Sequence, residues 1–313
     1  SHKLHEIRAL CSACTVLRGG RVTGFCDPRT ESTSGLSRMM IGTEPPALQH
    51  VPARAGAVVM SVHQLTLPST DPFGTDLQQI DFHVRAGEVV GIAGVSGNGQ
   101  RELLASLSGE DSRAQADAIR LTGISVGDQG PELRRRQGMH FVPEERLGRG
   151  AVPGLSLSQN LLLTRTEAVG RWGWVSTAKL TQQAQAIIDR FRVKAPGPSA
   201  LARALSGGNL QKFIVGREIS AKPRVLVVSQ PTWGVDVGAA AQIRTELLAL
   251  RDAGCAVLVV SEELDELLEL SDRLHVMARG RLSPSIDRSA ATPELIGRWM
   301  SGLWEEGGLR AAV

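Results

Sequence analysis

The sequence predicts an α/β fold with a mostly parallel central sheet. Apolar runs at residues 225–228 and 256–260 have the length of buried strands. Segments with a helical pattern alternate with such runs, and this alternation is typical of a parallel sheet covered by helices on both faces. The second observation is an internal repeat, because residues 1–42 align without a gap over residues 261–302.

Each expected element follows from its local pattern. Ser176 is suited to cap a helix, Pro293 occupies the first position of another, and a helix that begins near Asn209 stops before Pro223. Residues 110–205 lack the alternation and are expected to form a helical insertion. The expected strands are 58–67, 80–84, 88–93, 224–228 and 255–260, and the expected helices are 101–107, 176–191, 209–219, 238–252, 263–270 and 292–300.

The repeat predicts the domain organisation. Ser1 aligns with Ser261, Glu6 with Glu266, and Leu10 with Leu270, all at an offset of 260. We therefore expect residues 1–42 to be the C-terminal tail of a first domain and residues 58–313 to be a second copy. Residues 43–57 contain three prolines and are expected to form a stiff linker. Because Ser1 is not an initiator methionine, the chain is expected to be a fragment.

Composition argues against several classes of protein. The chain has 35 basic and 32 acidic residues, a balance that does not favour a nucleic-acid binder. No apolar run approaches the roughly 20 residues that span a bilayer, and the first residues do not resemble a signal peptide. Cys11 and Cys14 have the spacing of a metal or redox pair, but no second ligand pair follows, so we expect two small residues in a packed segment.

A glycine-rich turn is predicted between the strand at 88–93 and the next helix. Gly94 and Gly99 have the spacing of a phosphate-binding loop, in which backbone amides and a helix N-terminus surround an anion. Such a loop continues with Lys and then Ser or Thr, but Gln100 and Arg101 stand here. The candidate nucleotide-binding residues are Gly94, Ser96, Gly97, Asn98, Gly99, Gln100, Arg101 and Glu102.

A second motif opens the helix near residue 209, where glycines and a serine hydroxyl can receive a phosphate. Its residues are Leu205, Ser206, Gly207, Gly208, Asn209 and Gln211. The run resembles the signature sequence of ATP-binding-cassette (ABC) proteins, in the form found in monosaccharide and nucleoside importers. The resemblance implies a P-loop NTPase cassette with an antiparallel β part and a helical subdomain. It also implies that this loop contacts the ATP held by an opposing cassette.

The same resemblance assigns roles to several strand ends. The family's strand ends in Asp and Glu, which bind magnesium and polarise water, but Ser229 and Gln230 occupy these positions. The family's switch histidine corresponds to His2 in the first copy and to Glu262 in the second, where a surface acid at a helix start is expected. Asp236 matches a loop that touches the opposing cassette, although a solvated turn explains it equally well.

Two further positions depart from the family pattern. The glutamine that joins the core to the helical part would fall near Pro143 and Glu144. The aromatic residue that stacks on adenine is missing near residues 67–69, and Phe73 is a weak substitute that we expect to be a packing residue. These changes, together with Gln100, Ser229 and Gln230, predict a degenerate second cassette.

The resulting hypothesis is a tandem ABC ATPase for import of a simple sugar or nucleoside. ATP and Mg²⁺ are expected mainly at the first cassette's site, and the fragment alone is expected to be inactive. Expected partners are the first cassette, two membrane permease subunits and, indirectly, a solute-binding protein, with no nucleic acid, at the cytoplasmic face of the membrane. The alternatives are a non-catalytic nucleotide-sensing domain and a soluble ABC ATPase that acts on ribosomes or DNA.

Overall fold

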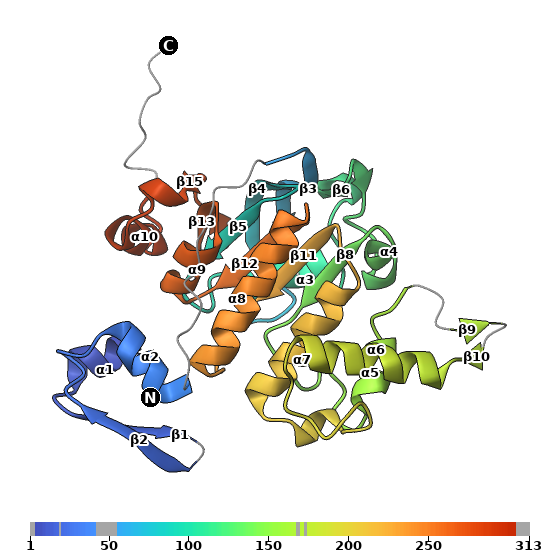
Figure 1. Cartoon of the computed structure of the whole chain (residues 1–313). Coiled ribbons are helices and arrows are strands. Elements are labelled where there is room, and N and C mark those ends of the chain that lie inside the picture. Colours follow the sequence, from blue (N-terminus) through green and yellow to red (C-terminus); the bar gives the residue numbers. More distant parts are fainter. Residues whose placement is uncertain (1–3, 19, 42–54, 167–169, 172–173, 305–313) are drawn as a thin grey trace.

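The computed structural model describes residues 4–18, 20–41, 55–166, 170–171 and 174–304. His2 and most of the predicted linker lie outside this part of the chain. The structure is built around two sheets that share one core, with helices over the outer face of the larger sheet (Figure 1).

The larger sheet is mostly parallel, as predicted. Its strands follow the order β14-β13-β5-β12-β11-β8, and β15 pairs with β13. The strands β13, β5, β12, β11 and β8 run parallel to one another, whereas β14 and β15 are antiparallel to β13. Their bounds are β5 Val89–Ala93, β8 Met139–Val142, β11 Val225–Ser229, β12 Ala256–Ser261, β13 Arg273–Ala278, β14 Arg281–Leu282 and β15 Ile286–Asp287.

The smaller sheet is antiparallel and covers one face of the larger one. Its order is β4-β3-β6-β7, with β3 Val58–Leu67, β4 Leu77–Arg85, β6 Ile119–Leu121 and β7 Ile124–Ser125. Successive residues of a central strand enter different cores: Val90 and Ile92 pack toward this sheet, and Val89 and Ala93 pack toward the helices. Burial on both faces explains why β5 is a continuous apolar run rather than an alternating one.

The helices lie close to their predicted positions. The α-helices that follow the first strands are α3 Gln100–Ser108, α4 Pro131–Arg136, α5 Leu157–Leu162, α6 Thr177–Arg190, α7 Gly207–Ser220, α8 Val237–Asp252, α9 Leu264–Leu270 and α10 Pro293–Met300. Short 3₁₀ turns occupy Ala116–Ala118, Ala202–Ala204 and Arg288–Ala290. The hydroxyl of Ser176 accepts a hydrogen bond from the Lys179 backbone N–H and caps α6, as predicted.

The helical insertion is shorter than predicted. Strands β6, β7 and β8 all lie within residues 110–205, and β8 is an edge strand of the larger sheet. The helical part therefore begins after β8, with α5, the small hairpin of β9 Gly170–Arg171 and β10 Trp174–Val175, and α6. The prediction was wrong at this boundary because strands of two to four residues are too short to show a period of two.

The repeat also appears in the secondary structure. Residues 4–41 form α1 Leu4–Leu10, β1 Cys14–Arg18, β2 Arg21–Cys26 and α2 Thr33–Ile41. At an offset of 260 these match α9, β13, the strands after it, and α10. The pairing agrees as well, since Cys14 faces Cys26 in the first copy and Leu274 faces Ile286 in the second.

A buried charge cluster joins the helical part to the larger sheet. Glu218 on α7 is fully buried and pairs with Arg217 at 2.7 Å, Arg135 at 2.8 Å and His140 at 2.8 Å. Burial opposes ionisation of Glu218, but these three partners outweigh it and hold the pKa of its carboxyl well below its usual range. Arg217 also donates to the Asn160 carbonyl of α5 at 3.2 Å.

We expect Glu218→Leu to lower the free energy of unfolding at pH 7 by about 3–5 kcal/mol, because it leaves buried cations without their anion. Since the folded-state pKa is depressed, the contribution of Glu218 is present above its unfolded pKa and is lost as pH falls below it. Urea unfolding at several pH values measures both effects. Glu132→Leu, at an exposed carboxylate on α4, is the control, and equal losses in the two variants would contradict the assignment.

Candidate nucleotide site and signature helix

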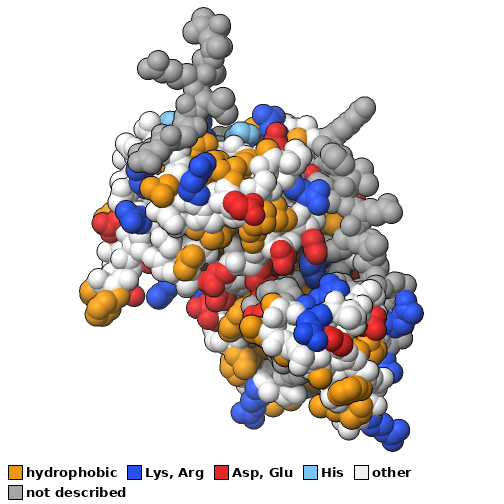
Figure 2. Space-filling view, turned by 90° about the vertical axis from the view of Figure 1, so that its left-hand side faces the viewer, with side chains coloured by type: hydrophobic (Ala, Val, Ile, Leu, Met, Phe, Trp, Pro, Cys, Tyr) orange, Lys and Arg blue, Asp and Glu red, His pale blue; other side chains and the backbone are white. Residues whose placement is uncertain are grey.

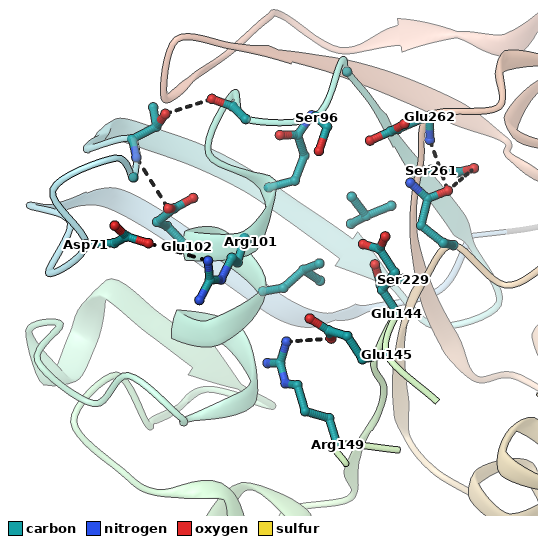
Figure 3. Close-up of a pocket in the computed structure, with 18 of the residues that line it drawn as sticks. Asp71, Ser96, Arg101, Glu102, Glu144, Glu145, Arg149, Ser229, Ser261 and Glu262 are labelled. Atoms are coloured by element: carbon teal, nitrogen blue, oxygen red, sulfur yellow. Dashed lines mark hydrogen bonds and ion pairs between the residues drawn. The ribbon is translucent and has the colours of Figure 1, made fainter. Parts of the chain in front are cut away.

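A cavity of about 270 Å³ lies at the edge of the larger sheet where its parallel strands end (Figure 3). The carboxyl ends of parallel strands meet at one edge, so β5, β11, β12 and β8 bring their following residues together there. The lining residues include Gly94, Ser96, Gly97, Gln100, Arg101, Glu102, Glu144, Ser229, Gln230 and Glu262. The structure therefore unites the predicted phosphate loop with the predicted strand ends.

The phosphate loop has the expected backbone conformation, but the Gln100 side chain folds back across it. Gly97 and Gly99 have φ angles of 85° and 105°, which favour glycine, and Gly99 begins α3 without a capping side chain. The Gln100 side chain donates to the Val95 carbonyl at 2.9 Å and accepts from the Asn98 N–H at 3.1 Å. The Gln100 side chain thus binds the Asn98 N–H, one of the backbone amides that would otherwise be free to bind an anion.

Arg101 and Glu102 do not replace the missing lysine and hydroxyl. Arg101 is exposed and its guanidinium lies 3.6 Å from the Asp71 carboxylate. Glu102 accepts a hydrogen bond from the Thr75 N–H at 3.3 Å, and the Thr75 hydroxyl donates to the Gly97 carbonyl. Both side chains therefore hold the loop of residues 71–75 against the phosphate loop, as Figure 3 shows.

The cavity carries excess negative charge. Its lining has the carboxylates Asp71, Glu102, Glu144, Glu145 and Glu262, but only two guanidinium groups, Arg101 and Arg149. Both arginines are already paired, Arg149 with Glu145 at 2.9 Å and also with Glu110. Burial raises the pKa of Glu144, and the nearby charges of Glu145 and Glu262 raise it further. A bare polyphosphate would be repelled here.

The strand ends offer no carboxylate to a metal ion. Ser229 is 2% exposed, and the Gln230 amide oxygen accepts from the Glu262 N–H at 3.3 Å. Within the described ranges no group of three or more His, Cys, Asp or Glu side chains is placed to hold a metal. The residues of this cavity therefore do not fit Mg²⁺ in the way the family pattern requires.

Two predictions about single residues need revision. Phe73 is 98% exposed on the cavity wall, so the expectation of a packing residue is wrong. The reason is its loop, which turns outward where the Phe73 N–H bonds the Asp71 carboxylate at 3.0 Å. Glu262 is exposed, as expected of a surface acid, but it also lines the cavity. Cys11 is exposed and not packed.

The signature residues form an open helix N-terminus. Ser206 precedes α7 and is exposed, and its hydroxyl accepts from the Asn209 side chain at 2.9 Å rather than from a backbone amide. The backbone amides of Gly207 and Gly208 begin the helix. Leu205 packs against the core, and Gln211 is buried and donates to the Pro231 carbonyl at 3.1 Å. The first turn of α7 thus remains available to an anion.

Arg146 and Trp233, which the sequence did not single out as functional, flank this helix start. Arg146 donates to Gln211 at 3.2 Å and to the Trp233 carbonyl, and it lies 5.7 Å from the centre of the Trp233 ring. A side-chain carbon added at Gly207 would lie 2.6 Å from the end of the Arg146 side chain, which would have to move aside. Asp236 caps α8 by accepting from the Ala239 N–H at 2.9 Å.

The signature residues are absent from the lining of the cavity. The phosphate loop and the signature helix of the described chain therefore do not form one site between them.

Comparison with known proteins identifies the family. The profile described as ABC transporter matches residues 77–233, which include the cavity loop, the signature residues and the end of β11. The chain belongs to the ABC transporter family. Among the described residues, none of the helices is both long and apolar enough to cross a bilayer.

Curated relatives of this ABC cassette include import proteins from bacteria and archaea. It is 33% identical over 96% of its length to the nucleoside import ATP-binding protein NupA of Lactococcus lactis. It is 35% identical over 94% to the guanosine import protein NupO of Bacillus subtilis, and 37% identical over 96% to the glucose import protein TsgD13 of Haloferax volcanii. The chain spans 60%, 58% and 56% of these relatives, respectively.

Solved structures share the cassette fold. A nucleotide-free ATP-binding cassette from an ABC transporter aligns with a TM-score of 0.63 and 19% identity, covering 77% of this chain and 98% of that one. The ADP conformation of the cassette MJ1267 aligns with a TM-score of 0.60 and 20% identity, covering 80% and 97%. The predicted fold class is thereby confirmed.

We expect Gln100→Lys to tighten ATP binding to residues 58–313 by about tenfold or more, because it frees the Asn98 amide and adds a cation beside the phosphates. Isothermal titration at fixed salt measures the change. Gln182→Lys, at an exposed position of α6, adds the same charge away from the cavity. Equal affinities of the two variants would contradict the role given to Gln100.

We expect ATP affinity to rise as pH falls toward the raised pKa of Glu144, because protonation removes a negative charge from the cavity. Glu144→Gln should bind ATP about threefold to tenfold more tightly than wild type at pH 8 and should show a flatter pH dependence. Glu132→Gln controls for the titration of ATP itself. A wild-type pH profile that Glu144→Gln leaves unchanged would refute the assignment.

Proposed function

We propose that this chain is the C-terminal half of the ATP-binding subunit of an ABC importer for a simple sugar or nucleoside. In this proposal its signature helix completes the ATP site of an upstream cassette, and its own cavity hydrolyses ATP poorly or not at all. The observation that carries the proposal is the contrast within one domain: α7 presents an open N-terminus, whereas the strand ends at Ser229 and Gln230 offer no carboxylate.

Residues 4–41 support the existence of an upstream cassette. Leu10 and Leu17 are 83% and 67% exposed, but Leu270 and Met277, their counterparts in the repeat, are fully buried. Figure 2 views the molecule from the side on which residues 4–41 lie. It shows hydrophobic side chains exposed on the lower part of this face. In the second copy β13 pairs with β5, so β1 requires an equivalent strand to complete its sheet. An upstream cassette would supply this strand and cover these side chains.

The cavity of this chain lacks the charged groups that would stabilise the transition state of ATP hydrolysis. Phosphoryl transfer depends on cations that neutralise charge on the transferred group and on a residue that orients the attacking water. Here Gln100 is neutral, the arginines are paired with carboxylates, and the Gln230 side chain is held by the backbone N–H of Glu262, directly after β12. We place ATP and Mg²⁺ chiefly at the upstream site, together with His2, which lies outside the described residues.

Among the residues that line the cavity of this chain, exposed Phe73 is best placed to contact a nucleotide base. It lies on the cavity wall near the phosphate loop, and its ring is free to lie against a planar group. Nucleotide binding without hydrolysis at this cavity would let the second cassette respond to ATP and close on the first.

Contact with two permease subunits is proposed for the surface around the helical part. Leu133, Leu147, Val152 and Leu163 are each 41–54% exposed there, and Arg149 links this region to the cavity through Glu110 and Glu145. This arrangement would place the protein at the cytoplasmic face of the membrane, with a solute-binding protein reached through the permeases. The near-balance of charges favours no nucleic-acid partner.

We expect Ser206→Trp in the complete protein to lower ATPase activity by about 100-fold or more, because it blocks the N-terminus of α7 that would contact ATP. Steady-state phosphate release by the permease-bound protein measures this loss. Thr177→Trp, at the exposed first position of α6, is the matched control. Unchanged activity of Ser206→Trp would exclude the proposed role of the signature helix.

A further inference from the structure

A buried carboxylate on α9 lies outside the cavity and takes no part in the proposed reaction. Glu266 is 3% exposed. One carboxylate oxygen accepts from the Thr232 hydroxyl at 2.5 Å, and the other accepts from the Ser261 hydroxyl at 2.8 Å. Burying a carboxylate is costly unless polar partners compensate it, and in the described part of the chain the groups that bond its two oxygens directly are hydroxyls and not cations. The burial of Glu266 and its two hydrogen bonds to hydroxyls therefore indicate a structural role for this carboxylate.

The two hydroxyls belong to different loops. Thr232 lies in the loop 230–236, which follows β11 and ends at Asp236, the cap of α8. Ser261 ends β12 and begins the loop 261–263, and its hydroxyl accepts from the Glu263 N–H at 3.1 Å. Glu262 of this second loop lines the nucleotide cavity. Glu266 therefore joins the loop beside the cavity to the loop that leads away from it.

The loop 230–236 also contacts the signature helix. The Gln211 side chain donates to the Pro231 carbonyl at 3.1 Å, and a side-chain carbon added at Gly208 would lie 3.7 Å from the Asp236 carboxylate. The position of this loop consequently affects both Asp236 and the start of α7.

The internal repeat indicates that Glu266 has a structural role that does not depend on the switch histidine. Ser261 and Glu266 align with Ser1 and Glu6, so both copies keep the serine–glutamate pair at the same spacing. The residue after the serine differs, being His2 in one copy and Glu262 in the other. The pair is thus kept where the predicted switch histidine is replaced, as expected for residues that position loops.

We propose that Glu266 is a positioning residue whose carboxylate ties the loop 230–236 to the loop 261–263. The tie fixes the positions of Asp236 and of the start of the signature helix relative to the nucleotide cavity of the same cassette. Its consequence for catalysis rests on the proposed function, in which these elements face the upstream cassette, but the tie itself does not.

Amide hydrogen exchange in the 313-residue chain tests the tie directly. We expect Glu266→Leu to accelerate exchange of the amides at residues 233–236 and 262–263 by about tenfold or more, because it removes both anchors. Thr232→Val should accelerate the first set more than the second, and Glu266→Gln, which keeps the size and one acceptor oxygen, should restore most of the protection. Asp265→Asn, an exposed acid on the same helix, is the control. If Glu266→Leu does not fold, faster exchange at residues 233–236 in Thr232→Val supports the tie, and exchange equal to that of Asp265→Asn overturns it.

ATPase assays of the complete protein with its permease then separate the two claims. We expect Glu266→Leu and Thr232→Val to lower kcat several-fold with little change in KM for ATP, and Glu266→Gln to retain most activity. Unchanged exchange in Glu266→Leu and Thr232→Val relative to Asp265→Asn, even with an active wild type, would overturn the tie and leave the proposed function standing. Faster exchange together with a wild-type protein that hydrolyses no ATP would support the tie and refute the proposed function.

Discussion

The parallel arrangement of β5, β8, β11 and β12 is the constraint on which the rest of the structure depends. Because these strands run in one direction, the residues that follow them meet at one edge of the sheet, and the cavity forms there. The antiparallel sheet and α7 to α9 bury the two faces of these strands and so fix the edge in place. The chemistry of the cavity is then decided by a few side chains at the strand ends.

Those side chains give the cavity a charge opposite to the one a nucleotide site needs. Gln100 bonds the loop amide of Asn98, and carboxylates at Glu144 and Glu262 face the space where phosphates would lie. The signature helix shows none of these changes, since its first turn is open and glycine is retained where Arg146 approaches. Two elements of one domain therefore differ in what they can offer to ATP, which is the physical basis for assigning them to different sites.

Much of this could be predicted from the sequence. The long apolar strands, the Ser176 cap, the repeat and the signature residues rest on local patterns that packing preserves. The short strands β6 to β8 could not be predicted, because a few residues carry no measurable period. Phe73 is expected from the sequence to be a packing residue, whereas its loop turns outward and exposes it. Glu266 stands out in the sequence only as a residue shared by both copies, because its role depends on a contact with Thr232, which is distant in sequence, together with one to the nearby Ser261.

The central claim is that the second cassette contributes to hydrolysis without performing it. Photo-crosslinking of 8-azido-ATP labelled at the α-phosphate to the complete protein during turnover tests this most directly, if the halves are then separated by cleavage within residues 43–57. We expect labelled ADP on the upstream half and only unhydrolysed ATP, or little label, on residues 58–313. Comparable amounts of ADP on the two halves would show that both cavities hydrolyse ATP and would contradict the account.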